Sequence, residues 1–277
     1  MNFSEKIEEY YKKYSNDVLN CDLIKFYNHT KGPQTLSWVG TDTEKRFRAN
    51  KRNKLSEQQR DTINYYTKNP ITYKINGHGF RDVSLKHKPK QVDVFLGCSH
   101  TFGVGLHKEH LWTTKLANYT KFPSINAGIP GSGIMTQFRI IKYLLDRFEI
   151  RKVYHYSILE HIRYEWFNGE EFFSTGLYTP GIIDIEKYAP LWAEENLALQ
   201  KYVYFNAIKS LCESAGTEYI PFTDQVLGIY LSKDEDFEDK YLLARDLTHH
   251  AVDKHHQVFK NCITLSKTDR PKIKTFI

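Results

Sequence analysis

The sequence predicts a three-layer α/β domain, in which helices cover both faces of a parallel sheet, preceded by an N-terminal extension. From residue 91 onward, short apolar runs alternate with longer segments of helical periodicity, which is the pattern of a parallel sheet covered on both sides. Before residue 90 the hydrophobic residues are scattered among polar segments such as 41–45. We therefore expect residues 1–90 to form an extension that packs on a main domain over residues 91–277.

Four strands are expected, at 91–96, 123–126, 151–159 and 218–222. The first has the sequence QVDVFL and ends at Gly97, as is typical of a strand buried in a parallel sheet. The other three are short segments separated from one another by helical patterns. Ligands of such sheets bind beyond the carboxyl ends of the strands, and the unusual residues of this chain fall there.

Helices are expected at about 111–119, 134–148, 198–212 and 252–263. The second is the clearest, because its apolar residues recur at steps of four, three, four and three and so share one face of a helix. These residues are Ile134, Phe138, Ile141, Leu145 and Phe148. The extension itself opens with a charged helical pattern over residues 3–14.

The composition is that of a soluble globular protein, with 40% hydrophobic and 26% charged residues among 277. A formal net charge of +6 falls short of one concentrated basic stripe, so no nucleic-acid partner is expected; the densest basic run, 45–54, fits a solvated helix face or loop. The four cysteines are far apart, which fits reduced thiols. Without a signal-peptide core or a membrane-spanning segment, we expect a cytoplasmic protein with no membrane partner.

The most distinctive segment is 97–105, GCSHTFGVG, directly after the first strand. A serine between a strand end and a helix start is exposed at the top of the sheet, where backbone N–H groups point toward a bound substrate. Such donors can stabilise the negative oxygen of a tetrahedral intermediate. Ser99 is therefore the candidate nucleophile.

A serine hydroxyl needs a neighbouring base that takes its proton. Asp246 and His249 are three positions apart, a spacing that can place a carboxylate and an imidazole on one side of a turn. His250 is the alternative base. We expect His255 and His256 to be packing or surface residues, with His256 on the apolar face of the last helix. The histidines do not have the spacing of a zinc site, so we expect no metal.

Several segments resemble the conserved blocks of the SGNH (GDSL-like) hydrolases. Residues 97–103 resemble the first block, with Gly-Cys-Ser in place of the usual Gly-Asp-Ser, and 126–131, NAGIPG, resemble the second. Residues 246–249, DLTH, are similar to the final Asp-x-x-His block, and 76–81, NGHGFR, to a segment that often precedes the first block. The resemblance covers residues 73–262 in order and spacing, and it implies a flavodoxin-like α/β/α sandwich without a cofactor.

The resemblance also implies residue roles. Ser99 is the nucleophile, and its N–H and that of Gly128 form the oxyanion hole; His249 is the general base and Asp246 its orienting partner. The third block of the family carries an asparagine that donates to the oxyanion, and the matching strand of this chain lacks it. Loss of one such donor costs about a hundred- to a thousand-fold in rate, unless His161 or Asn168 replaces it.

Three functions stay open. The first is a serine esterase that works through an acyl-enzyme on a small-molecule or carbohydrate ester, for example a carbohydrate acetylesterase. The second is an inactive binding or structural module, such as a virion or glycan-associated protein of viral origin, and the third is a sugar O-acyltransferase. The segment from about 160 to 190 follows a strand end and can form a substrate wall, for which Glu160, His161 and Trp166 are the candidates.

Overall fold

In a computed structural model of the protein, the residues that the structure describes are 33–81, 90–157, 163–167, 172–176, 194–223, 242–249 and 252–267. Its centre is a sheet of four parallel strands in the order β4-β3-β5-β8. The strands are β3 (Gln91–Gly97), β4 (Ser124–Gly128), β5 (Glu149–Tyr156) and β8 (Glu218–Phe222). Numbered along the chain, this order is 2-1-3-4, as in the flavodoxin-like doubly wound sheets.

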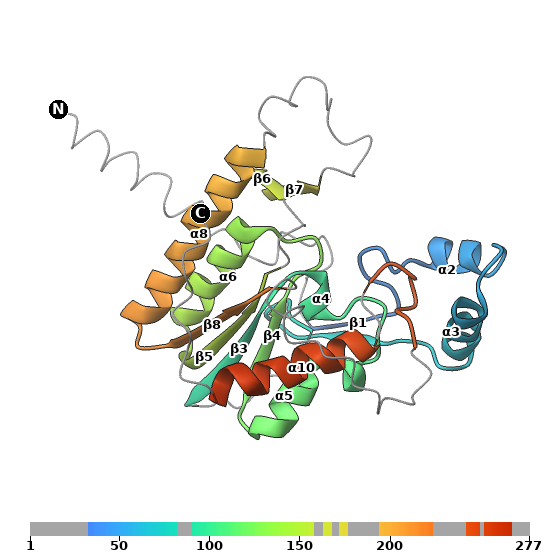
Figure 1. Cartoon of the computed structure of the whole chain (residues 1–277), viewed down its shortest axis with the longest axis horizontal. Helices are drawn as coiled ribbons and strands as arrows, with labels where there is room; N and C mark the ends of the chain where they lie inside the picture. Colours follow the sequence, from blue (N-terminus) through green and yellow to red (C-terminus); the bar gives the residue numbers. More distant parts are fainter. Residues whose placement is uncertain are drawn as a thin grey trace.

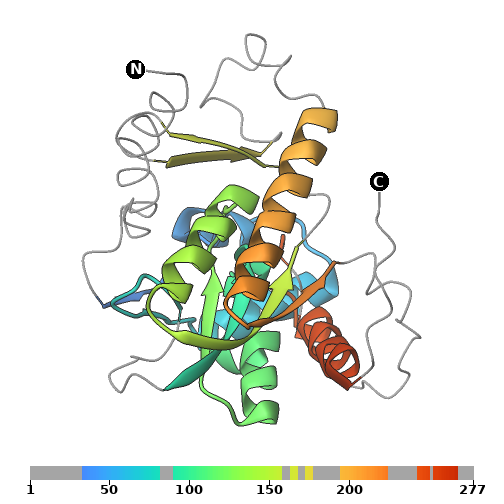
Figure 2. The same ribbon diagram turned by 90° about the vertical axis from the view of Figure 1, so that its left-hand side faces the viewer.

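Helices cover both faces of the sheet (Figures 1 and 2). On one face lie α6 (Ile134–Leu145) and α8 (Glu194–Ser214), whose apolar residues share a core with β3 and β5. On the other lie α5 (Trp112–Thr120) and α10 (Val252–Lys267), which share a second core with the same strands. The predicted three-layer α/β class is confirmed, and each of the four predicted strands and four predicted helices overlaps one of these elements.

The burial of β3 explains its nearly continuous apolar sequence. Side chains of a strand point alternately to the two faces of a sheet, and here both faces are covered. Val92, Val94 and Leu96 pack in the core with α6 and α8, whereas Phe95 packs in the core with α5 and α10. Asp93 is the polar exception, and its buried carboxylate accepts hydrogen bonds from Nε and Nη2 of Arg151, at 2.9 and 2.6 Å.

The described part of the N-terminal region contains an antiparallel pair, β1 (Gln34–Leu36) with β2 (Tyr73–Ile75), and two helices, α2 (Glu44–Asn50) and α3 (Glu57–Lys68). Their apolar side chains form a third cluster, which also contains Phe102 and Val104 from the segment after Ser99. Phe80 packs in the main core instead. The boundary at residue 90 stays a prediction, and these contacts tie the N-terminal residues to the segment that carries the candidate nucleophile.

Two further strands, β6 (Arg163–Phe167) and β7 (Phe172–Gly176), pair in antiparallel fashion, with Arg163 opposite Gly176. The sequence predicts a substrate wall in the segment from about 160 to 190, but not this strand pair. The helical pattern at residues 3–14 lies outside the described residues. Among the helices that are described, none combines the length and the apolar character needed to cross a bilayer.

Candidate active site

The carboxyl ends of three strands meet at one edge of the sheet. Gly97 at the end of β3 is in register with Gly128 on β4 and with Tyr156 on β5. Ser99 follows at once, as the first residue of the short helix α4 (Ser99–Phe102). A Cβ atom at Gly128 would lie 2.3 Å from the backbone nitrogen of Phe102, so only glycine lets α4 lie this close to β4.

Asp246 and His249 form a direct pair. The Nδ1 atom of His249 lies 2.7 Å from Oδ2 of Asp246. The other carboxylate oxygen, Oδ1, accepts the backbone N–H groups of Thr248 and His249 at 3.1 and 3.2 Å. The three-residue spacing thus folds the loop around the carboxylate, and Nδ1 carries the proton that it donates to Asp246.

Two hydroxyl groups complete the surroundings of the Asp246 carboxylate, with Thr41 donating to Oδ2 at 2.6 Å and Thr248 at 2.8 Å. Burial by itself would raise the pKa of Asp246, but the hydrogen bond and charge of His249, together with these two hydroxyls, outweigh it. The pKa of Asp246 therefore lies well below its ordinary value. The carboxylate is ionised at neutral pH and can stabilise a protonated His249.

Ser99 precedes the residue that contacts this pair. Its hydroxyl has the Cys98 thiol as a partner at 4.0 Å, and no hydrogen bond joins Ser99 to His249 within the described residues. The next residue, His100, provides the contact, because its ring lies 4.9 Å from the ring of His249, centroid to centroid. Nothing in the local sequence around His100 indicates this contact, because its partner lies 149 residues away.

The oxyanion assignments stay predictions. The N–H group of Gly128 donates to Oδ1 of Asn126 at 3.1 Å, and the amide nitrogen of Asn126 donates to the carbonyl of Thr101 at 3.0 Å. An oxyanion would have to share the Gly128 N–H with Asn126 or displace that side chain. Ser99, at the start of α4, carries the other predicted donor.

The predicted substrate wall is only partly described. Glu160 and His161 lie outside the described residues, and of Trp166 only the backbone is described, opposite Phe173 in the β6–β7 pair. Asn168, which with His161 was a predicted replacement for the missing oxyanion donor, also lies outside them. These predictions are therefore untested.

A buried carboxylate that the sequence analysis missed, Glu165 on β6, binds the start of α6. It accepts the N–H groups of Gly133 and Thr136, at 3.1 and 2.9 Å, and the Thr136 hydroxyl. Burial raises the pKa of Glu165, although these hydrogen bonds act in the opposite direction. This carboxylate fixes β6 to the N-terminus of α6.

The NGHGFR segment has a structural role that its sequence does not reveal. The Oδ1 atom of Asn76 accepts the N–H groups of His78 and Phe80, which closes a tight turn. This turn directs Arg81 into the protein, where its guanidinium donates to the carbonyl groups of Phe102, Gly103 and Leu106. Arg81 thus holds the end of α4 and the loop after Ser99, where the carbonyls of a helix end lack partners.

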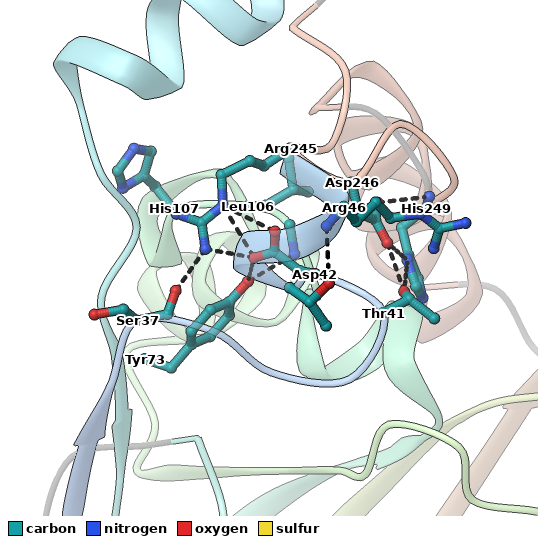
Figure 3. Close-up of polar contacts among 12 residues, drawn as sticks. Ser37, Thr41, Asp42, Arg46, Tyr73, Leu106, His107, Arg245, Asp246 and His249 are labelled. Atoms are coloured by element: carbon teal, nitrogen blue, oxygen red, sulfur yellow. Dashed lines mark hydrogen bonds and ion pairs between the residues drawn. The ribbon is translucent and has the colours of Figure 1, made fainter. Parts of the chain in front are cut away.

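A second buried cation supports the Asp246 loop (Figure 3). Arg245 donates from Nε and Nη2 to the Asp42 carboxylate, at 2.9 and 2.6 Å, and its Nη2 also donates to the carbonyl of Ser37. The Tyr73 hydroxyl also donates to the Asp42 carboxylate, and the oxygen of this hydroxyl accepts the N–H of Gly105 at 2.9 Å. The network joins the residue before Asp246 to the N-terminal region and to the loop after Ser99.

Of the two histidines on α10, His255 is the buried one, and its Nδ1 accepts the N–H of Trp112 at 3.2 Å. The prediction that these histidines are packing residues fits this contact, although His256 rather than His255 was placed on the apolar face. Within the described residues, no group of three or more His, Cys, Asp and Glu side chains is arranged to hold a metal ion.

Comparisons with known proteins add little to this geometry. No protein-family profile matches the sequence, and no curated protein is similar to it. A solved structure of a protein from Desulfitobacterium hafniense, described as lipolytic and of the G-D-S-L family, is similar with a TM-score of 0.31 and 11% identity. The similarity covers 64% of this chain and 99% of that one.

Proposed function

We propose that this protein is a serine ester hydrolase, with Ser99 as nucleophile, His249 as general base and Asp246 as the residue that orients His249. The observation that carries the proposal is the 2.7 Å contact between Nδ1 of His249 and an ionised, buried Asp246. A carboxylate on Nδ1 leaves Nε2 as the nitrogen that can accept a proton. The ring of His249 lies against His100, next to the candidate nucleophile.

The reaction that these groups support has two halves. The Ser99 oxygen forms a bond to the acyl carbon while its proton passes to Nε2 of His249, and the carbonyl π electrons move to the carbonyl oxygen. When the tetrahedral intermediate collapses, the alkoxide leaves and takes the proton from His249. Water then repeats both steps on the acyl-serine and releases the acid, while Asp246 stays ionised throughout.

The first half requires the Ser99 hydroxyl to come within hydrogen-bond reach of Nε2 of His249. In the structure the partner of this hydroxyl is the Cys98 thiol, at 4.0 Å. Catalytic hydrogen bonds of ligand-free enzymes are often long and tighten when substrate binds. The sequence lacks the asparagine that donates to the oxyanion in the third block of the SGNH hydrolases. We therefore expect slower turnover than a complete oxyanion hole would allow.

Hydrolysis of p-nitrophenyl acetate tests the proposal. We expect a rate above the buffer background that falls by at least about a hundred-fold in Ser99→Ala and in His249→Gln. Ser132→Ala is the matched control, because it removes another buried serine hydroxyl at the same sheet edge, one that donates to the carbonyl of Gly97 at 3.3 Å. Equal rates for the wild type and Ser99→Ala would overturn the proposal.

A further inference from the structure

The N-terminal region places one tight turn, residues 39–42, beside the candidate active site. Val39 and Asp42 exchange two backbone hydrogen bonds of 3.1 Å, and Gly40 and Thr41 form the exposed tip. From this geometry we infer that Thr41 is a positioning residue of the site, whose hydroxyl fixes the Asp246 carboxylate and, through it, the imidazole of His249. The inference rests on the proposed function for its catalytic consequence, though not for the contact itself.

Among the described donors to the Asp246 carboxylate, the Thr41 hydroxyl is the one that comes from outside the Asp246 loop. Among the described donors to Asp246, Thr248 and His249 belong to the same loop and move with it. Thr41 comes from a segment 205 residues away and donates to Oδ2 at 2.6 Å. Oδ2 is also the oxygen that receives Nδ1 of His249, so Thr41 restrains the atom that sets the orientation of the ring.

The Thr41 oxygen also lies near the imidazole itself, 3.4 Å from Nδ1 of His249. Nδ1 donates its proton to Asp246, so the hydroxyl proton of Thr41 remains for the same carboxylate. Both donors then stabilise the ionised form of Asp246. Figure 3 shows the three side chains converging, with Thr41 approaching from the side of the N-terminal region.

The turn is anchored to the Asp246 loop, and it lies beside the two other segments that carry the predicted site. Asp42 forms the buried ion pair with Arg245, the residue before Asp246. A Cβ atom at Gly40 would lie 3.4 Å from the side chain of Pro130, in the turn that follows β4, and 3.8 Å from that of Val104, in the loop after Ser99. Thr41 is therefore held beside Asp246 by the buried ion pair of its neighbour Asp42.

A positioning role predicts a specific kinetic effect. The transition state needs Nε2 of His249 aimed at the serine oxygen and a fixed carboxylate behind Nδ1, whereas substrate binding needs neither. Without the Thr41 hydroxyl, Oδ2 of Asp246 loses its donor from outside the loop, and the pair can rotate. We therefore expect kcat to fall and KM to stay nearly constant.

The experiment compares Thr41→Val, which removes the hydroxyl but keeps the shape, with Thr41→Ser, which keeps the hydroxyl. In p-nitrophenyl acetate hydrolysis, Thr41→Val should lower kcat by about tenfold or more, with KM within about twofold, and Thr41→Ser should restore most of kcat. Thr43→Val is the matched control, since the Thr43 hydroxyl caps α2 by accepting the N–H of Arg46 at 3.1 Å and lies two residues away. It should leave kcat unchanged.

A second measurement separates this inference from the proposed function. In proton NMR, the Nδ1–H resonance of His249 should be sharp and downfield in the wild type, Thr41→Ser and Thr43→Val, and broadened or lost in Thr41→Val. If the wild type hydrolyses no ester but the resonance depends on the Thr41 hydroxyl, the proposed function fails and the positioning role stands. A resonance insensitive to Thr41→Val, or a loss of kcat that Thr41→Ser does not restore, overturns the inference.

Discussion

Arg245 and Asp42 form a buried bidentate ion pair, in which Nη2 and Oδ2 lie 2.6 Å apart and both side chains are at most 2% exposed. The pair joins two segments that are 203 residues apart in the sequence. It sits directly beside Asp246, and the Arg245 guanidinium also lies 3.9 Å from the centre of the Trp38 ring. The Asp246 loop is thus anchored by the N-terminal region at two adjacent residues.

Breaking this pair should be costly. Removal of one member of a buried ion pair leaves the other charge without compensation, so Asp42→Asn or Arg245→Met should each lower the free energy of unfolding by about 3–5 kcal/mol. The double variant should lose less than the sum of the two. Urea unfolding of the four proteins measures this coupling.

The exposed pair of Arg48 and Glu44, also at 2.6 Å, supplies the comparison. Arg48→Met should cost less than about 1 kcal/mol, because water screens a surface pair. The proposed anchoring would be contradicted if Asp42→Asn and Arg245→Met each lowered the free energy of unfolding as little as Arg48→Met does, and if the double variant lost the sum of the two.

The low pKa of Asp246 predicts how stability depends on pH. A carboxyl whose pKa is lower in the folded state than in the unfolded chain stabilises the fold at pH values above its ordinary pKa of about 4, and this contribution is lost as the pH falls further. The difference in unfolding free energy between the wild type and Asp246→Asn should therefore be largest near neutral pH and shrink below pH of about 4.

Urea unfolding at a series of pH values from 6 to 3 measures this difference. Asp146→Asn serves as the control, because the Asp146 carboxylate is 53% exposed in its pair with Lys142. Water screens such a surface pair, so this variant should lose less than about 1 kcal/mol of unfolding free energy throughout the series. If the Asp246→Asn difference stays constant across the series, Asp246 is not held in its ionised form by the contacts described above.

Gly105 connects the loop after Ser99 to the Asp246 loop, and its replacement should disturb both. Its φ of +79° is strained for any residue with a side chain, and a Cβ atom would lie 2.9 Å from Cβ of Ala244 and 3.0 Å from the nitrogen of Arg245. Gly105→Ala should lower the free energy of unfolding by about 1–3 kcal/mol or more. It should also slow the hydrolysis of p-nitrophenyl acetate, in which Ser99 is the proposed nucleophile.

Gly216→Ala isolates the effect of backbone strain in this comparison, because Gly216 has a φ of +68° but open space around its Cβ position. It should cost about 1 kcal/mol and leave the reactivity of Ser99 intact. Equal effects of both variants on the reactivity of Ser99 would show that the contact with the Asp246 loop is immaterial.

The fold class was predictable because the signals that define it are local. The apolar run of β3 and the periodicity of α6 are properties of consecutive residues, and the structure has the predicted strand and helix at these positions. The close pairing of Asp246 with His249 follows in the same way from a three-residue spacing. The role of Ser99 as nucleophile remains a prediction.

The supporting residues were not predictable, because their partners are distant in sequence. Thr41 and Asp42 lie in a polar segment that looks like an ordinary surface loop, and nothing local shows that it meets residues 245 and 246. Glu165 likewise resembles any charged residue of an insertion until α6 is folded beside it. Such long-range polar contacts carry no periodicity that a single sequence could reveal.

The most direct test of the account is to label the protein with a fluorophosphonate and to measure its intact mass and the modified residue over time. We expect a single adduct on Ser99 in the wild type, none in Ser99→Ala, and labelling slowed by at least about a hundred-fold in His249→Gln. Labelling of Ser99→Ala at the wild-type rate, or a wild type that takes up no label, would contradict this account.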